Sequence, residues 1–160
     1  MKYNSEQEDF WAGEFGEEYI QRNQSKELLA SNIHFFSNAL KNAGKINSCV
    51  EFGANVGMNL RAIKSLYPNI SLSGIEINSL ASSELRKIIG ENNVFNSSIF
   101  DVEIKEQYNL SLIKGVLIHI QPELLQRAYQ KLYDLSNKYI LIAEYYNPSP
   151  VTIPYRGHSD

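Results

Sequence analysis

The chain has 160 residues, of which 43% are hydrophobic and 21% charged, and its formal net charge is −3. This length and composition predict one globular domain that can bury a sizeable core. Proteins that bind nucleic acids usually carry a basic surplus or a basic stripe, and the sequence has neither, so we expect no nucleic-acid partner.

The apolar stretches and the single cysteine indicate where in the cell the protein is found. No run of about 18 apolar residues is present, so we expect no transmembrane helix and no membrane partner. The opening "MKYNSEQEDF" lacks the apolar centre of a signal peptide. Cys49 is the single cysteine and falls in a predicted strand, which favours a buried thiol over a reactive one. These features predict a cytoplasmic protein.

The N-terminal segment is charged and aromatic, with an ambiguous helical pattern. Its aromatic residues could form one apolar face of a lid helix, or they could simply dock a helix on the core (Phe10, Trp11, Phe15 and Tyr19). We expect residues 1–24 to be an N-terminal lid or cap, and residues 25–160 to form the core of a single domain.

From Ser25 onward, helical and extended patterns alternate. Ser25 can cap a first helix, which should stop near Gly44. The predicted strands are Cys49–Phe52, Ile70–Ile75, Val94–Ser97, Leu110–Val116 and Lys138–Ala143. The predicted helices are Asn59–Tyr67, Ser79–Ile89 and Pro122–Tyr133, with a short turn near Asp101–Lys105. This alternation predicts an α/β fold, a Rossmann-like three-layer sandwich with a mainly parallel sheet in the order 3-2-1-4-5. Ligands of such sheets bind at the carboxyl ends of the strands.

The stretch "VEFGANVGMN", residues 50–59, leaves the first predicted strand at that edge. A dinucleotide site requires G-x-G-x-x-G, but here Asn55 replaces the middle glycine and Gly57 comes one residue early. The pattern is instead acid-x-Gly-x-x-x-Gly. It favours a turn under the methionine and ribose parts of S-adenosylmethionine. The residues that we expect at this cofactor are Glu51, Gly53, Ala54, Asn55, Gly57 and Asn59.

Acidic residues also follow the next two predicted strands. Glu76, followed by Ile77, ends the second strand, where a carboxylate can accept hydrogen bonds from both ribose hydroxyls. The alternative for Glu76 is a solvated acid at a strand end. Asp101, flanked by Ser98 or Ile99, could accept a hydrogen bond from the exocyclic amine of adenine, or it could cap the short turn.

Several longer segments resemble class I S-adenosylmethionine-dependent methyltransferases, namely "VEFGANVGMNL", "SGIEIN", "LIKGVLIHI" and "YILIAEYYNPSPVTIPYRGHSD". More narrowly, they and the N-terminal "FWAGEFGEEYIQRN" resemble the clade of pseudaminic acid biosynthesis-associated methylases. The resemblance implies S-adenosylmethionine as cofactor and S-adenosylhomocysteine as product. It also implies a small-molecule acceptor, a sugar hydroxyl in nonulosonic (pseudaminic) acid or surface-glycan biosynthesis.

The expected strands depart from the pattern of that class in number. Class I methyltransferases have seven strands, whereas only five can be placed here before Asp160. We therefore expect that strands 6 and 7 are missing from a truncated chain. The fifth strand would then be an exposed edge, which must be covered, charged or paired. A homodimer formed through this edge is one expectation.

Methyl transfer to a sugar hydroxyl requires a group that takes up the proton. His119 follows the fourth predicted strand and is the first candidate for this base, with a structural histidine as the alternative. His158 is the rival base. Lys114 is a candidate for cofactor binding that could also bind an acidic sugar or be a solvated lysine. Tyr19 and Arg22 could reach the methionine carboxylate of the cofactor.

The loop after the fifth predicted strand suits a sugar, because aromatic faces pack on sugar rings and a guanidinium pairs with carboxylates or phosphates. The expected substrate-binding residues are Tyr145, Tyr146, Asn147, Tyr155 and Arg156, although they could instead pack the loop onto the core. No residues show metal-ligand spacing. Two other functions stay open. One is a non-catalytic S-adenosylmethionine-binding partner that regulates a sugar-modification pathway. The other is an NAD(P)-dependent sugar enzyme, which the missing middle glycine disfavours.

Overall fold

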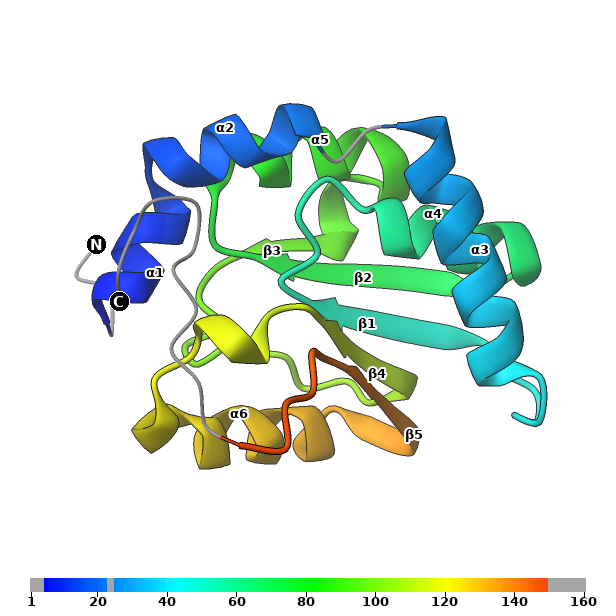
Figure 1. Cartoon of the computed structure of the whole chain (residues 1–160). Coiled ribbons are helices and arrows are strands. Elements are labelled where there is room, and N and C mark those ends of the chain that lie inside the picture. Colours follow the sequence, from blue (N-terminus) through cyan, green and yellow to red (C-terminus); the bar gives the residue numbers. More distant parts are fainter. Residues whose placement is uncertain (1–4, 23–24, 150–160) are drawn as a thin grey trace.

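The computed structural model describes residues 5–22 and 25–149, the side chains of residues 21 and 22 excepted. In this part of the chain, the centre is a sheet of five parallel strands in the order β3-β2-β1-β4-β5 (Figure 1). The strands are β1 (Ser48–Phe52), β2 (Ser71–Glu76), β3 (Val94–Asn96), β4 (Tyr108–Lys114) and β5 (Ser136–Ala143). The predicted fold class and strand order are confirmed.

Helices cover both faces of the sheet, which gives three layers. The helices are α1 (Glu6–Ala12), α2 (Glu14–Arg22), α3 (Lys26–Leu40), α4 (Met58–Leu66), α5 (Ser79–Ile89) and α6 (Pro122–Asp134), with short 3₁₀ helices η1 (Glu91–Asn93) and η2 (Leu117–His119). α3, α4 and α5 lie on one face, and α6 lies on the other (Figure 1). α1 and α2 lie near the carboxyl ends of the central strands.

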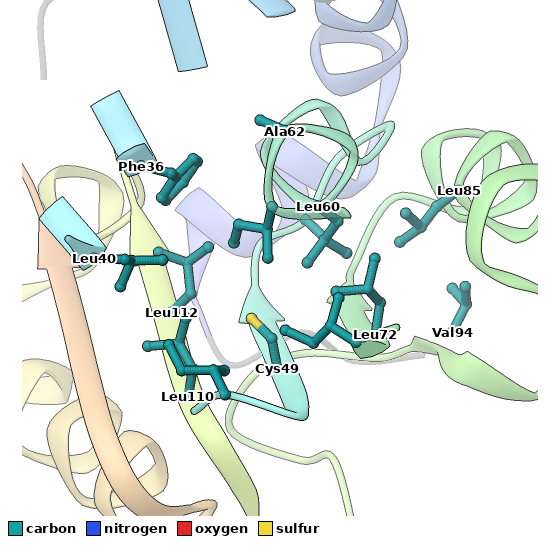
Figure 2. Close-up of a cluster of buried hydrophobic side chains, with 14 residues drawn as sticks. Phe36, Leu40, Cys49, Leu60, Ala62, Leu72, Leu85, Val94, Leu110 and Leu112 are labelled. Carbon is teal, nitrogen blue, oxygen red and sulfur yellow. The ribbon is translucent and has the colours of Figure 1, made fainter. Parts of the chain in front are cut away.

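Two buried clusters hold these layers together. Successive side chains of a strand point to opposite faces, so Cys49 of β1 joins one cluster while Val50 joins the other. The cluster under α3, α4 and α5 is drawn in Figure 2, where Phe36 and Leu40 lie on the side of the strand residue Leu112. The prediction that the Cys49 thiol is buried is confirmed. β1 lies between β2 and β4, so the direction of strand addition reverses beside it, at the switch point where open α/β sheets bind ligands.

Several predicted boundaries differ from those of the structure, and the reason is local for two strand and helix ends. The fourth strand was expected to run to Val116 but ends at Lys114, because Gly115 adopts a φ of +68° that takes the chain out of the sheet. The first helix of the core was expected to stop near Gly44 but ends at Leu40, where a tight turn brings the Ala43 N–H to the Leu40 carbonyl at 2.9 Å.

β5 is an edge strand of the described sheet. Its Tyr139 and Leu141 pack against the cluster under α3, whereas Ile140 and Ile142 on the opposite face are 42% and 49% exposed. The expected exposure of the fifth strand is therefore confirmed for the described residues, and a homodimer through it stays a prediction. No helix in the described part of the chain is both long enough and apolar enough to cross a membrane.

Candidate functional site

A cavity of about 220 Å³ opens at the carboxyl ends of β1, β2 and β4. Its lining comes from α1 and α2, the start of α3, the turn after β1, the end of β2 and the loops after β3 and β4. In Figure 1, the arrowheads of the central strands point toward α1 and α2 across this region. The cavity therefore lies at the switch point of the sheet, where the sequence predicts the ligand site.

The turn after β1 is packed so closely that two positions require glycine. Gly53 and Gly57 have φ values of +70° and +79°, and a Cβ added to either would stand 2.6 Å from a neighbouring side-chain carbon. Asn55 has a φ of 47°, which asparagine tolerates better than most residues. The Gly53 N–H donates to the Ile75 carbonyl at 2.9 Å. The turn is thus held against β2, and its residues 53–56 line the cavity.

Glu76 ends β2 and lines the cavity, with only 6% of its surface exposed. Its Oε2 accepts a hydrogen bond from the Asn55 N–H at 2.7 Å, and its Oε1 accepts one from the Asn78 N–H at 2.8 Å. Burial raises the pKa of the Glu76 carboxyl, and the backbone hydrogen bonds act in the opposite direction. Since each carboxylate oxygen accepts about two hydrogen bonds, Glu76 can also accept from a ligand with hydroxyl groups.

A second acidic residue lies behind the turn. The Asn59 Nδ2 donates to Oε1 of Glu51 at 2.6 Å. Glu51 Oε2 and Asn59 Oδ1 are buried and have no hydrogen-bond partner among the described residues. Burial raises the pKa of Glu51 to about 8. Asn59 lines the cavity, whereas Glu51 lies outside the lining and is bonded to Asn59. Two unpaired acceptors in this position suit a ligand group that is rich in N–H donors.

Lys114 ends β4 and supplies positive charge to the same part of the cavity. Its ammonium lies 5.9 Å from the centre of the Phe35 ring, an arrangement in which a cation is attracted to the ring face. The charge of Lys114 lowers the pKa of Glu51, although the larger effect of burial prevails.

His119 ends η2 in the loop after β4 and lines the cavity. Its ring lies against Trp11 of α1, with the ring centres 4.6 Å apart. Burial lowers the pKa of His119 to about 4. The imidazole is therefore neutral at neutral pH and can accept a hydrogen bond or a proton.

Asn78 connects the N-terminal helices to this site. Its Oδ1 accepts two backbone N–H groups at the start of α5, both at 3.0 Å, which caps that helix. Its Nδ2 lies 3.2 or 3.3 Å from the carbonyl oxygens of Trp11, Ala12 and Gly13 at the end of α1. The four aromatic residues were expected on one face of a single helix, but they lie on two helices, α1 and α2, which Gly13 separates. The ring of Trp11 nevertheless contacts Phe10, Phe15 and Tyr19. One buried amide thus joins α1 to the strand end that carries Glu76.

Most predicted cofactor residues meet at the cavity. Those that line it are Tyr19, Gly53, Ala54, Asn55, Asn59, Glu76, Ile77 and Lys114, while Glu51 and Gly57 lie outside the lining. Ser98 and Asp101 do not line it. The turn expected at Asp101–Lys105 occupies residues 99–101 instead, so Ile99 and Phe100 face the cavity while Asp101 pairs with Arg127 at 3.4 Å. The Ser98 hydroxyl donates to a Glu8 carboxylate oxygen.

Of the predicted substrate residues, the three that the structure describes are not brought to the cavity. Tyr145 and Tyr146 are 83% and 87% exposed, and Asn147 accepts the Ser149 N–H at 3.1 Å. The other candidates in this loop, Tyr155 and Arg156, and the rival base His158 lie outside the described residues. The side chain of Arg22 also lies outside them. Their roles stay predictions. Among the described residues, no group of three or more His, Cys, Asp or Glu side chains could hold a metal ion.

Some lining residues were not predicted from the sequence. Gln7 and Glu8 of α1, Asn32 of α3 and Val116 after β4 all face the cavity. A local signal existed for α1, because Ser5 stands three residues before Glu8, and the Ser5 hydroxyl accepts the Glu8 N–H at 3.2 Å. No local signal could have shown that α1 packs across the carboxyl ends of the strands.

No protein-family model and no curated protein matches the sequence. Solved structures with a similar fold include methyltransferases. The sugar N-methyltransferase KedS8 from Streptoalloteichus sp ATCC 53650 is 12% identical, with a TM-score of 0.68 over 92% of this chain and 58% of that one. The plantazolicin methyltransferase BpumL in complex with SAH is 20% identical, with a TM-score of 0.64 over 86% and 56%. Magnesium protoporphyrin IX methyltransferase (ChlM) from Synechocystis PCC 6803, with bound SAM, is 12% identical, with a TM-score of 0.62 over 89% and 77%.

The chain thus spans less than two thirds of the length of the first two of these proteins, 58% and 56%. At identities of 12% and 20%, the likeness is one of fold. The chain has the Rossmann-like fold of these methyltransferases.

Proposed function

We propose that the chain is an S-adenosylmethionine-dependent methyltransferase that acts on a small molecule, a sugar hydroxyl in nonulosonic (pseudaminic) acid or surface-glycan biosynthesis. The observation that carries this proposal is the buried carboxylate of Glu76, which lies beside the glycine turn at one cavity. Glu76 can accept hydrogen bonds from ribose hydroxyls. A dinucleotide would instead need close backbone approach at Asn55, where a side chain stands.

The residues behind the turn fit the methionine end of this cofactor. Glu51 Oε2 and Asn59 Oδ1 are buried acceptors without a partner among the described residues. An α-ammonium group carries three N–H donors and a positive charge, so it would satisfy both acceptors. Lys114 lines the same cavity and suits the α-carboxylate.

The apolar part of the cavity lining fits an adenine ring. It is formed by Ile77, Ile99 and Phe100. Gln7 also lines the cavity, and its Oε1 is buried without a partner among the described residues, so it can accept a hydrogen bond from an exocyclic amine. In this arrangement α1 and α2 serve as a lid over the cofactor.

When bound, S-adenosylmethionine supplies a methyl group on a positively charged sulfur. The chain's own residues have to orient the acceptor and take up its proton. We assign the proton to a ring nitrogen of His119, which lines the cavity and is held against Trp11. Its lowered pKa keeps the ring in the proton-accepting form at the expense of basic strength. A general base contributes about 10²–10⁴-fold to a rate.

The sugar acceptor is supported by the resemblance of the segment from 144 to 158 to the pseudaminic acid clade. It is also consistent with the description of one fold neighbour as a sugar N-methyltransferase. These two points support the acceptor class, and the cofactor is supported independently by the residues that line the cavity.

Calorimetry followed by turnover assays tests the proposal. S-adenosylmethionine and S-adenosylhomocysteine should bind, and NAD should not. Nonulosonic acids and their nucleotide-linked forms are then tested as acceptors, with the gain of a methyl group detected by mass spectrometry. Binding of NAD alone would contradict the cofactor assignment. Binding of S-adenosylmethionine without methylation of any of these acceptors would favour a non-catalytic partner protein of a sugar-modification pathway.

A further inference from the structure

Glu144, the first residue after β5, bonds to the loop that follows β4. Its Oε1 accepts the Val116 N–H at 2.9 Å and the Leu117 N–H at 3.0 Å. Hydrogen bonds to a charged acceptor are roughly twice as strong as neutral ones. Glu144 is not among the residues predicted from the sequence, because nothing in the local sequence shows that it faces a loop 27 residues earlier.

The loop needs an anchor at this point because it is leaving the sheet. The Gly115 N–H makes the last backbone bond to β5, to the Ala143 carbonyl at 3.0 Å. Gly115 then turns the chain with a φ of +68°. The N–H groups at the start of a helix have no acceptor within it, and the Glu144 carboxylate supplies one for two of them.

The anchored segment forms one wall of the cavity. Val116 lies over Gly53, so close that a Cβ on Gly53 would stand 2.6 Å from Val116 Cγ2. Three residues later, His119 places its ring against Trp11. Both Val116 and His119 line the cavity, whereas Glu144 does not. A shift of the loop would therefore move the proposed base without removing any side chain from the cavity.

We propose that Glu144 is a positioning residue for methyl transfer, which holds the loop after β4 so that the His119 ring faces the acceptor. This inference rests on the proposed function, but its geometric part does not need turnover. Glu144 acts through the backbone of Val116 and Leu117, and it touches neither cofactor nor acceptor. Its effect should therefore fall on the turnover number and on the placement of His119, and hardly on cofactor affinity.

The test compares three substitutions of Glu144 with one control. Glu144→Ala removes the acceptor, and Glu144→Gln keeps a carbonyl oxygen that can accept both N–H groups. Glu144→Asp keeps the charge on a side chain one carbon shorter, and it serves as the second test if the alanine variant does not fold. The control is Glu106→Ala, an exposed acid just before β4, at the end of that strand far from the loop.

Two measurements decide the outcome. NMR of the His119 ring protons reports the ring-current shift caused by Trp11, and it needs no substrate. We expect Glu144→Ala and Glu144→Asp to lose this shift, and Glu144→Gln and Glu106→Ala to keep it. The kcat of Glu144→Ala should fall about 10- to 100-fold, the size of effect that small misplacements cause, with the cofactor dissociation constant unchanged.

The inference is overturned if the His119 signals stay in place in both Glu144→Ala and Glu144→Asp, or if the glutamine variant is as impaired as the alanine variant. Absence of cofactor binding and turnover in the unaltered protein would instead overturn the proposed function. The NMR comparison would still show whether Glu144 places the His119 ring.

Discussion

Asn59 donates a hydrogen bond from Nδ2 to Glu51 Oε1 at 2.6 Å, yet Glu51 Oε2 and the amide oxygen of Asn59 are buried without a partner among the described residues. A carboxyl group in such surroundings destabilises the fold when it is ionised. Burial accordingly raises the pKa of Glu51 to about 8. Residues with strongly shifted pKa values collect at functional sites, and Asn59, the hydrogen-bond partner of Glu51, lines the proposed cofactor cavity.

The first prediction concerns stability and pH in the absence of ligand. The pKa of Glu51 is raised from its ordinary value of 4.5 to about 8 in the folded protein. Its protonation therefore stabilises the fold fully below about 4.5, and this stabilisation is lost as the pH rises through about 8. We expect a loss on the order of a few kcal/mol over this range, and a flatter profile for Glu51→Gln. Urea unfolding at a series of pH values measures it, and parallel profiles for the two proteins would contradict it.

The second prediction concerns the proton that Glu51 holds. An ammonium group beside Glu51 favours the ionised carboxylate, so S-adenosylmethionine should displace this proton at neutral pH and bind more tightly as the pH rises toward 8. Calorimetry in buffers of different ionisation enthalpy counts the released protons. Glu51→Gln is the control, because its amide has no proton to lose in this range. Equal heats in all buffers for the unaltered protein would place the ammonium group elsewhere.

Glu76→Ala is the third test. The substitution removes the proposed acceptor for the ribose hydroxyls, and we expect cofactor affinity to fall by about 1–3 kcal/mol. Calorimetry gives the affinity, and circular dichroism checks that the variant is folded, since the Asn55 and Asn78 N–H groups also lose their acceptor. A folded variant with unchanged affinity would remove Glu76 from the site.

The parts of this site that the sequence predicted are those whose signals lie close together in the chain. Gly53 and Gly57 flank a turn that both strand and helix patterns delimit, and Glu76 stands at the end of an apolar run. Alternating apolar runs and helical patterns predicted the parallel sheet, and right-handed crossovers predicted a switch point beside the first strand. The predicted position of the ligand site followed from that switch point.

The parts that the sequence did not predict depend on contacts between distant segments. Asn78 and Trp11 are 67 residues apart, and only the packing of α1 on the strand ends brings them together. β4 begins two residues earlier than expected, because Tyr108 is buried with its hydroxyl bonded to Ser73 at 3.1 Å, a partner that no hydropathy pattern shows. Glu144 was missed for the same reason.

The fourth prediction separates catalysis from cofactor binding. His119→Ala should lower turnover by about 10²-fold or more if the ring accepts the acceptor's proton, while cofactor affinity changes little. His34→Ala is a matched control, since His34 is an exposed histidine on α3. Steady-state kinetics and calorimetry on the same preparations provide both numbers. If the turnover of His119→Ala equals that of His34→Ala, His119 is a structural histidine.

The last prediction concerns the link between α1 and the sheet. Asn78→Asp keeps the oxygen that caps α5 but turns the donor toward the three α1 carbonyls into an acceptor that repels them. We therefore expect α1 to detach while the sheet stays folded, because a carboxylate is also a good helix N-cap. Trp11 is the single tryptophan, so its fluorescence should shift to longer wavelength and report this change alone.

Asn93→Asp is the control for this substitution, because Asn93 also donates from Nδ2 to a backbone carbonyl, that of Ile89, but at an exposed site away from the cavity. Hydrogen exchange should quicken in α1 and α2 of Asn78→Asp and stay slow in β1 and β4. If α1 and α2 act as a lid, cofactor affinity falls with the same substitution. An unmoved Trp11 emission would show that the aromatic contacts, with Phe15 and Tyr19 against Trp11, hold α1 in place without the amide.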